Sequence, residues 1–182
     1  QISKFLEISF VCVQFENICR LSGSRYIETP ESLKKKHAII NVKNDDDLCF
    51  IYSILTITKA ELIKKDRNRV SQYIPYLETL KYDPTKMPMK LIDIPQFEKD
   101  NDLAINVLSY KEEKNIDTLG LKHPYINIIH RTKVKDVKPI YLLLLENQST
   151  FHYVAVVHLN RLLNVDVKDI SNVRIQSLWC EY

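Results

Sequence analysis

Residues 45–55, Asp-Asp-Asp-Leu-Cys-Phe-Ile-Tyr-Ser-Ile-Leu, pass from three acidic residues directly into an almost entirely apolar run. Asp46 or Asp47 can cap the N-terminus of a helix, because a side-chain carboxylate accepts hydrogen bonds from the backbone N–H groups of the first turn. Apolar residues then continue at helical density through Leu62. The stretch therefore predicts a helix that begins near Cys49 and packs into the core.

Further helices and then a set of strands are expected downstream. Residues 69–80 and 91–99 have helical spacing of their apolar residues, and Pro75 predicts a kink or a late start in the first of them. The pattern then becomes strand-like, in four apolar runs at residues 103–108, 125–129, 140–145 and 152–157. Helices that precede a mostly antiparallel sheet of about four to five strands are typical of the α+β class.

Length and composition indicate one ordinary globular domain. The 182 residues are 45% hydrophobic and 27% charged, which is enough to bury a core without disulfides or metal. We expect residues 1–21 to be an N-terminal extension, residues 22–163 to be the core of the single domain and residues 164–182 to be a tail. The chain has two glycines, Gly23 and Gly120, so it contains no glycine-rich phosphate loop and nucleotide enzymes are not expected.

Charge, cysteine content and hydropathy exclude further classes. The net charge of +3 is spread rather than gathered in a stripe, so nucleic-acid binding is not expected. The four cysteines contain no Cys-x-x-Cys pair, so we predict no metal site and no cofactor. Residues 5–13 are apolar but too short to span a bilayer, and no cleavable signal is present. We therefore expect an intracellular location, in the cytoplasm or nucleus, without membrane association.

Cys49 and His152 form the candidate catalytic pair. Cys49 lies in the first turn of the expected helix, where the partial positive charge of the helix end favours a thiolate. The neighbouring aspartates oppose this effect, so a nearby imidazolium is needed. His152 opens the last strand-like run, with Val154 and Val156 on the same face, and this order of cysteine and histidine is that of papain-like folds. Taken singly, a cysteine in a buried helix is usually a small core residue, and that reading stays open.

The sequence leaves the third catalytic group open. Asn160 lies eight residues after His152, which is roughly 26 Å along an extended strand and too far to orient the imidazole. Asp166 could return to the imidazole on a hairpin, and otherwise the pair acts as a dyad. For the oxyanion, Asn44 can donate its side-chain amide, and the backbone N–H of Cys49 can add a second donor.

Four blocks of the chain carry a resemblance, at residues 23–27, 36–50, 92–99 and 151–163. They resemble a domain found in proteins of large eukaryotic DNA transposons of the Polinton or Maverick type, over roughly residues 22–163. The resemblance implies a papain-like cysteine protease fold, with N-terminal helices that carry the nucleophile at a helix start. It also implies that Cys180 is the first cysteine of a possible zinc finger, truncated here. Such relatives often have Trp where this chain has Tyr52.

Asp46, Cys49 and Phe50, together with His152-Tyr153, resemble the motifs of ovarian-tumour-type deubiquitinases. In those enzymes an Asp precedes the nucleophile by three residues, which makes Asp46 a candidate for orienting the site or shaping its oxyanion loop. Those enzymes have glycine directly after that Asp, whereas this chain has a second aspartate, so the tight oxyanion turn of the family is not reproduced.

Viral tegument-type deubiquitinases are another possible relative. They have an Asp two residues before the histidine, where this chain has Thr150. Both likenesses imply isopeptide chemistry on ubiquitin or a ubiquitin-like protein. The acidic residues Asp45 and Asp47 can attract a basic tail, and Tyr153, directly after the histidine, is a further substrate-binding candidate.

Two hypotheses follow. The first is a cysteine-dependent peptidase or isopeptidase, most plausibly a deubiquitinase that cleaves after the C-terminal tail of ubiquitin or a ubiquitin-like protein. The alternative is a non-catalytic module of a transposon polyprotein that binds protein or DNA. The sequence does not predict an oligomeric state.

Overall fold

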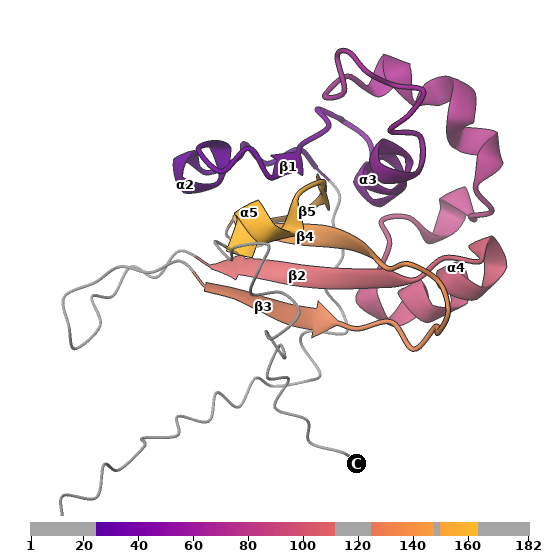
Figure 1. The fold of residues 1–182 in the computed structure, drawn as a ribbon. Helices are drawn as coiled ribbons and strands as arrows, with labels where there is room; N and C mark the ends of the chain where they lie inside the picture. Colours follow the sequence, from indigo (N-terminus) through magenta and orange to yellow (C-terminus); the bar gives the residue numbers. More distant parts are fainter. Residues whose placement is uncertain (1–24, 112–124, 148–149, 164–182) are drawn as a thin grey trace, which may run out of the picture.

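The computed structural model describes residues 25–111, 125–147 and 150–163 (Figure 1). Its centre is a five-stranded sheet with the strand order β1-β5-β4-β2-β3. The strands are β1 (Ile39–Ile40), β2 (Ile105–Lys111), β3 (Tyr125–His130), β4 (Ile140–Asn147) and β5 (Thr150–Val156). The sheet is mixed, since β1/β5, β4/β5 and β2/β3 pair antiparallel and β2/β4 pair parallel.

The four strand-like runs of the sequence all form strands, which confirms the α+β class and the expected number of strands. The β4 strand and the β5 strand form a hairpin in which Leu144 lies opposite Tyr153. The parallel pair was not expected, and it arises because β4 inserts between β2 and β5 instead of following β3 along the sheet edge. The short β1 strand was expected only as an apolar run.

The helices surround the sheet. The expected helix at Cys49 is confirmed as α3 (Cys49–Thr58) and ends earlier than the apolar pattern suggested. The helix expected at residues 91–99 is confirmed as α4 (Ile94–Asn101), with Pro95 in its first turn. Two one-turn helices were not expected, α2 (Glu31–Lys34) and α5 (Leu159–Leu163).

The region between α3 and α4 is built from 3-10 helices. The α-helix expected at residues 69–80 is instead η1 (Val70–Gln72) followed by η2 (Ile74–Thr79), and Pro75 stands in the first turn of η2. Proline lacks the N–H that a continuous α-helix needs, so the break falls where the sequence predicted a late start. Two more short turns, η3 (Pro84–Lys86) and η4 (Leu91–Asp93), lead into α4.

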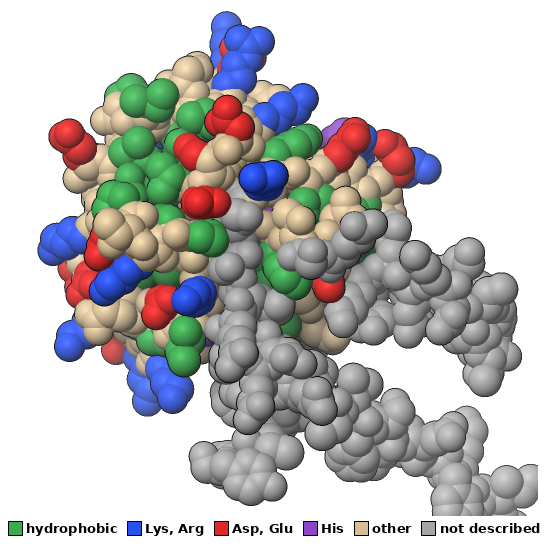
Figure 2. All heavy atoms as spheres, turned by 180° about the vertical axis from the view of Figure 1, so that it is seen from behind, with side chains coloured by type: hydrophobic (Ala, Val, Ile, Leu, Met, Phe, Trp, Pro, Cys, Tyr) green, Lys and Arg blue, Asp and Glu red, His purple; other side chains and the backbone are tan. Residues whose placement is uncertain are grey.

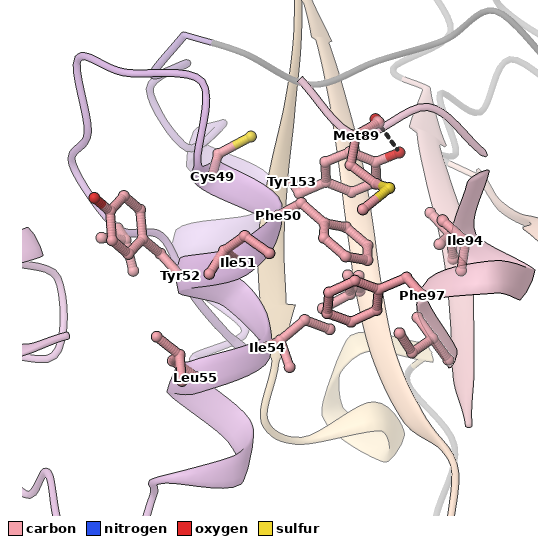
Figure 3. Close-up of a cluster of buried hydrophobic side chains, with 14 of the residues drawn as sticks. Cys49, Phe50, Ile51, Tyr52, Ile54, Leu55, Met89, Ile94, Phe97 and Tyr153 are labelled. Atoms are coloured by element: carbon pink, nitrogen blue, oxygen red, sulfur yellow. Dashed lines mark hydrogen bonds between the residues drawn. The ribbon is translucent and has the colours of Figure 1, made fainter. Parts of the chain in front are cut away.

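Apolar side chains fill both faces of the sheet. On one face, α3 and α4 pack against side chains that include Leu142, Leu144 and Tyr153. The ring of Phe50 is its aromatic centre, with edge-on contacts to Phe97 and to Tyr153 at centroid distances of 5.1 and 5.2 Å (Figure 3). The second cluster lies on the opposite face and contains Leu33, Leu108, Leu143, Leu145, Val154, Val156 and Leu162.

The contact between α3 and β5 positions the candidate site. The β1 strand pairs only with Ala155 and Val156, so the outer edge of β5 is open to α3 at Tyr153. Ser53 Oγ donates a hydrogen bond of 3.0 Å to the carbonyl oxygen of Tyr153. Cys49 lies one helical turn before Ser53 and is thereby held beside the same segment of β5.

Two features of the described residues bear on membranes and charge: the hydropathy of the helices and the side chains on one face of the surface. None of the helices in these residues is long and apolar enough to cross a bilayer. On the face shown in Figure 2, the Lys and Arg side chains are scattered among acidic and apolar ones. This dispersion agrees with the modest net charge of +3.

Candidate active site

Cys49 is the first residue of α3, and its side chain is fully buried, at 0% exposure. Burial raises the pKa of the thiol to about 12. Backbone hydrogen bonds from Tyr153 and Phe50 oppose this rise, whereas the charges of Asp46 and Asp47 increase it. The thiol is therefore protonated at neutral pH, and the expected thiolate is not formed in this conformation. The rise in the thiol pKa that burial causes is larger than the lowering expected from the helix N-terminus.

His152 is the third residue of β5, and its side chain is also fully buried, at 0% exposure. Burial lowers the pKa of the imidazole to about 4, while the backbone of Arg25 and Val42 acts in the opposite direction. The ring is therefore neutral at neutral pH. Val154 and Val156 share its face of the sheet, as the alternation of the strand predicted.

Asn41 holds the imidazole by one ring nitrogen. The distance between His152 Nε2 and Asn41 Oδ1 is 2.8 Å. The Nδ2 group of Asn41 donates to the carbonyl oxygen of Ile27 and to Thr29 Oγ1, at 2.8 and 2.9 Å, so the amide oxygen is the atom that faces the ring. Because an amide oxygen only accepts, Nε2 carries the proton of the neutral imidazole. His152 Nδ1 is then the basic nitrogen, and it is buried without a hydrogen bond among the described residues.

The structure brings Cys49 and His152 to the same short segment of β5. The thiol lies against the backbone of Tyr153, the residue that directly follows His152. Figure 3 shows Cys49 at the start of α3, on the end of the helix near Tyr153. Within the described residues, no hydrogen bond links the sulfur to the imidazole. Cys49 belongs to the first core cluster, whereas the imidazole of His152 shares the sheet face of Leu145 and Val154, which belong to the second cluster. The two side chains therefore lie toward different faces of the sheet and do not form a preformed ion pair.

The acidic loop before Cys49 is tied together by Asp46. Its Oδ1 accepts from the backbone N–H of Leu48 and from Asn44 Nδ2, both at 3.0 Å, and its Oδ2 accepts from the hydroxyl of Tyr52 at 2.8 Å. The Asn44 amide, expected in the oxyanion hole, is thus engaged inside the loop. Burial and then this carboxylate raise the pKa of Tyr52. The Asp46 carboxylate thus fixes the conformation of the loop that leads into α3.

The three candidates for substrate binding differ in their exposure to solvent. Asp45 and Asp47 are exposed on the loop beside Cys49, where a basic ligand can reach them. Tyr153 is completely buried, with its ring against Phe50 and its hydroxyl donating to the carbonyl oxygen of Met89 at 3.3 Å. Its side chain has no access to a substrate, so the expectation for Tyr153 is corrected: it is a core residue.

Among the described residues, the side chain that is hydrogen-bonded to the imidazole of His152 is that of Asn41. The β5 strand ends at Val156 and Asn160 lies in α5, so the chain does not stay extended as assumed. Asp166 and Cys180 lie outside the described residues. The partner of His152 is Asn41, which sequence reasoning missed. A signal was present, because Asn41 interrupts the apolar run of residues 38–42, and a polar side chain in such a run needs a partner.

Comparison of the chain with models of protein families, with curated proteins and with solved structures finds no match. Among the described residues, no group of three or more His, Cys, Asp and Glu side chains is arranged to hold a metal ion. A buried thiol at a helix start, a neutral imidazole and an amide that fixes it are the groups available for chemistry at this site.

Proposed function

We propose that this chain is a cysteine-dependent peptidase or isopeptidase, with Cys49 as nucleophile, His152 as general base and Asn41 as the group that orients the imidazole. The observation that carries the proposal is the 2.8 Å hydrogen bond between His152 Nε2 and Asn41 Oδ1. It leaves Nδ1 as the basic nitrogen, buried and without a hydrogen-bond partner in the described residues. A base held in one tautomer by a side-chain oxygen is the arrangement that sulfur nucleophiles need.

The reaction starts from a neutral pair, because burial raises the pKa of Cys49 and lowers that of His152. In this proposal the site opens, which uncovers the sulfur and admits the substrate, and the imidazole, which faces the second core cluster at rest, moves to the sulfur. His152 Nδ1 takes the thiol proton as Cys49 Sγ attacks the carbonyl carbon, and then gives that proton to the leaving amine. The resulting thioester is hydrolysed by a water that loses its proton to the same nitrogen, which releases the acid and restores the thiol.

Backbone N–H groups at the start of α3 are the donors that we assign to the oxyanion. The N–H of Cys49 lies at a helix N-terminus, where it has no acceptor one turn earlier inside the helix. The bonds of Asp46 to Leu48 and Tyr52 hold the loop in front of it. Rigid donors stabilise a developing oxyanion better than mobile ones, so Asp46 supports the hole without contacting the substrate.

The substrate that we propose is a protein with an extended, basic C-terminal tail, such as ubiquitin or a ubiquitin-like protein. The support is the exposure of Asp45 and Asp47 beside the nucleophile, since opposite charges favour docking and fast association. The likeness to deubiquitinases and to transposon protease domains points to the same class.

A hydrolysis assay tests the proposal. The full 182-residue chain is incubated with ubiquitin and with ubiquitin-like proteins that carry a fluorogenic amide at the C-terminus. We expect turnover by the natural chain, and losses of at least about 100-fold in Cys49→Ala and His152→Gln. Ile92→Ala, at a side chain that is 64% exposed, is the matched control and should keep full activity. Equal turnover in Cys49→Ala would exclude sulfur catalysis.

A non-catalytic interaction module is the second candidate. The observation that favours it is that Cys49 and His152 are both 0% exposed, as core residues are. In that case the Asn41–His152 bond serves stability alone, and no member of the substrate panel is cleaved. Binding without cleavage, unchanged in Cys49→Ala, would support this candidate.

A further inference from the structure

The ring of Tyr26 makes a further contact with the imidazole of His152. The ring centroids are 5.7 Å apart and the planes meet at 72°, which is an edge-on arrangement. Such geometry places the positive edge of one ring on the negative face of the other, so it is favourable as well as space-filling. Tyr26 itself is half-buried.

The segment that carries Tyr26 is hydrogen-bonded to the side-chain amide of Asn41, which also binds the imidazole. Asn41 Nδ2 donates to the carbonyl oxygen of Ile27 and to Thr29 Oγ1, and Asn41 Oδ1 faces His152. The side chain of Ile27 is buried in the second core cluster. Residues 25–29 thus form a strap across the histidine, anchored one residue after Tyr26.

One hydrogen bond alone leaves the rotation of the imidazole loosely defined. In a histidine ring, Nε2 lies close to the axis of the Cβ–Cγ bond, whereas Nδ1 lies farther from it. The Asn41 contact at Nε2 therefore fixes the end of the ring more firmly than it fixes the direction of Nδ1. Further contacts are needed to fix that direction, and the ring of Tyr26 supplies one beside the backbone of Arg25 and Val42.

We propose that Tyr26 is a positioning residue for His152: its ring sets the rotation of the imidazole so that Nδ1 keeps one direction. This inference rests on the proposed function for its catalytic consequence, but the positioning itself does not require activity. The contact belongs to the ring of Tyr26 and not to its hydroxyl, so phenylalanine should replace it and leucine should not.

The test compares Tyr26→Phe and Tyr26→Leu with the natural chain. NMR of the His152 ring nitrogens at neutral pH reports the tautomer, and the hydrolysis assay reports kcat and KM. In the natural chain and in Tyr26→Phe we expect one tautomer, protonated at Nε2. In Tyr26→Leu we expect averaged nitrogen shifts and, with an active chain, a kcat lower by about 10- to 100-fold at unchanged KM.

Tyr76→Leu is the control for loss of a half-buried aromatic ring elsewhere, since Tyr76 packs against the first core cluster. It should leave the nitrogen shifts and kcat unchanged. The proposal is overturned when Tyr26→Leu keeps the natural shifts, or when Tyr26→Phe fails to restore them. A chain that shows the expected shifts but cleaves no substrate would refute the proposed function and leave the positioning role intact.

Discussion

The side chains of Asn41 and His152 lie 111 residues apart in the sequence and share a hydrogen bond of 2.8 Å. The bond joins the residue after β1 to the third residue of β5, two strands that are neighbours in the sheet. It sets the tautomer of the imidazole and leaves Nδ1 as the base. The chemistry that we propose for Cys49 depends on it.

Asn41→Ala should destabilise the fold as well as abolish orientation of the imidazole. The substitution leaves the buried Nε2–H group without its acceptor and removes the bonds to the 25–29 strap, so we expect a loss of about 1–3 kcal/mol in the free energy of unfolding. Urea titration measures it. Asn127→Ala, at an exposed position of β3, is the control and should change stability by no more than about 0.5 kcal/mol. Equal effects of the two variants would contradict the account.

The stability of the fold should fall as the pH drops through the range between the two pKa values of His152. The pKa is 6.5 for a free histidine and about 4 in the fold. Between these values the unfolded chain binds a proton that the folded chain does not, so the stabilisation is complete above pH 6.5 and is lost on acidification. The total amounts to roughly 3 kcal/mol.

The variant His152→Gln isolates this contribution, because glutamine does not titrate. Burial also lowers the pKa of His130, against the opposing charge of Glu98, so a part of the acid sensitivity has another source. The difference in unfolding free energy between the natural chain and His152→Gln should therefore become smaller as the pH falls. Curves of unfolding free energy that stay parallel over this window would show that His152 is not buried in its neutral form.

The thiol of Cys49 should react slowly with iodoacetamide in the resting protein. Its pKa is raised from 9.0 to about 12, so the thiolate fraction at a given pH is lower by about 1000-fold. The rate is followed by mass spectrometry in a chain with Cys12→Ser, Cys19→Ser and Cys180→Ser. We expect it to keep rising with pH beyond the pKa of a free thiol. A plateau near neutral pH would instead indicate a preformed thiolate–imidazolium pair.

Phe50→Ala should be among the most destabilising substitutions in the described core. The ring is 0% exposed and has edge-on contacts with Phe97 of α4 and Tyr153 of β5. Its removal leaves a cavity that costs about 3–5 kcal/mol. Ile92→Ala, at an exposed position before α4, should change stability by less than about 0.5 kcal/mol. Chemical denaturation of both variants checks the prediction.

Local patterns predicted most of the elements of this fold. The strands β2 to β5 and the start of α3 follow from runs of apolar residues and from the acidic loop at residues 45–47. The 3-10 helices were misjudged as one α-helix, because apolar spacing does not distinguish the two and Pro75 only marks the break. The parallel pairing of β2 with β4 depends on which strand inserts between which, and that is a property of the whole sheet.

Sequence reasoning selected Cys49 and His152 for the candidate site but not the groups that surround them. The position of Cys49 at a helix start suggested a thiolate, but its burial beside Tyr153, which reverses the sign of the pKa shift, depends on packing between distant segments. Asn41 was missed for the same reason, since β1 and β5 meet only in the folded chain. The participation of the Asn44 amide in the acidic loop likewise depends on the local conformation around Asp46.

Covalent capture tests the central claim most directly. The full chain is incubated with ubiquitin and ubiquitin-like proteins that end in a thiol-reactive electrophile, and the intact mass and the modified peptide are measured. The account predicts one adduct on Cys49, with a rate lower by at least about 100-fold in His152→Gln. Absence of an adduct with every probe, or labelling of Cys49 at the same rate without His152, would contradict it.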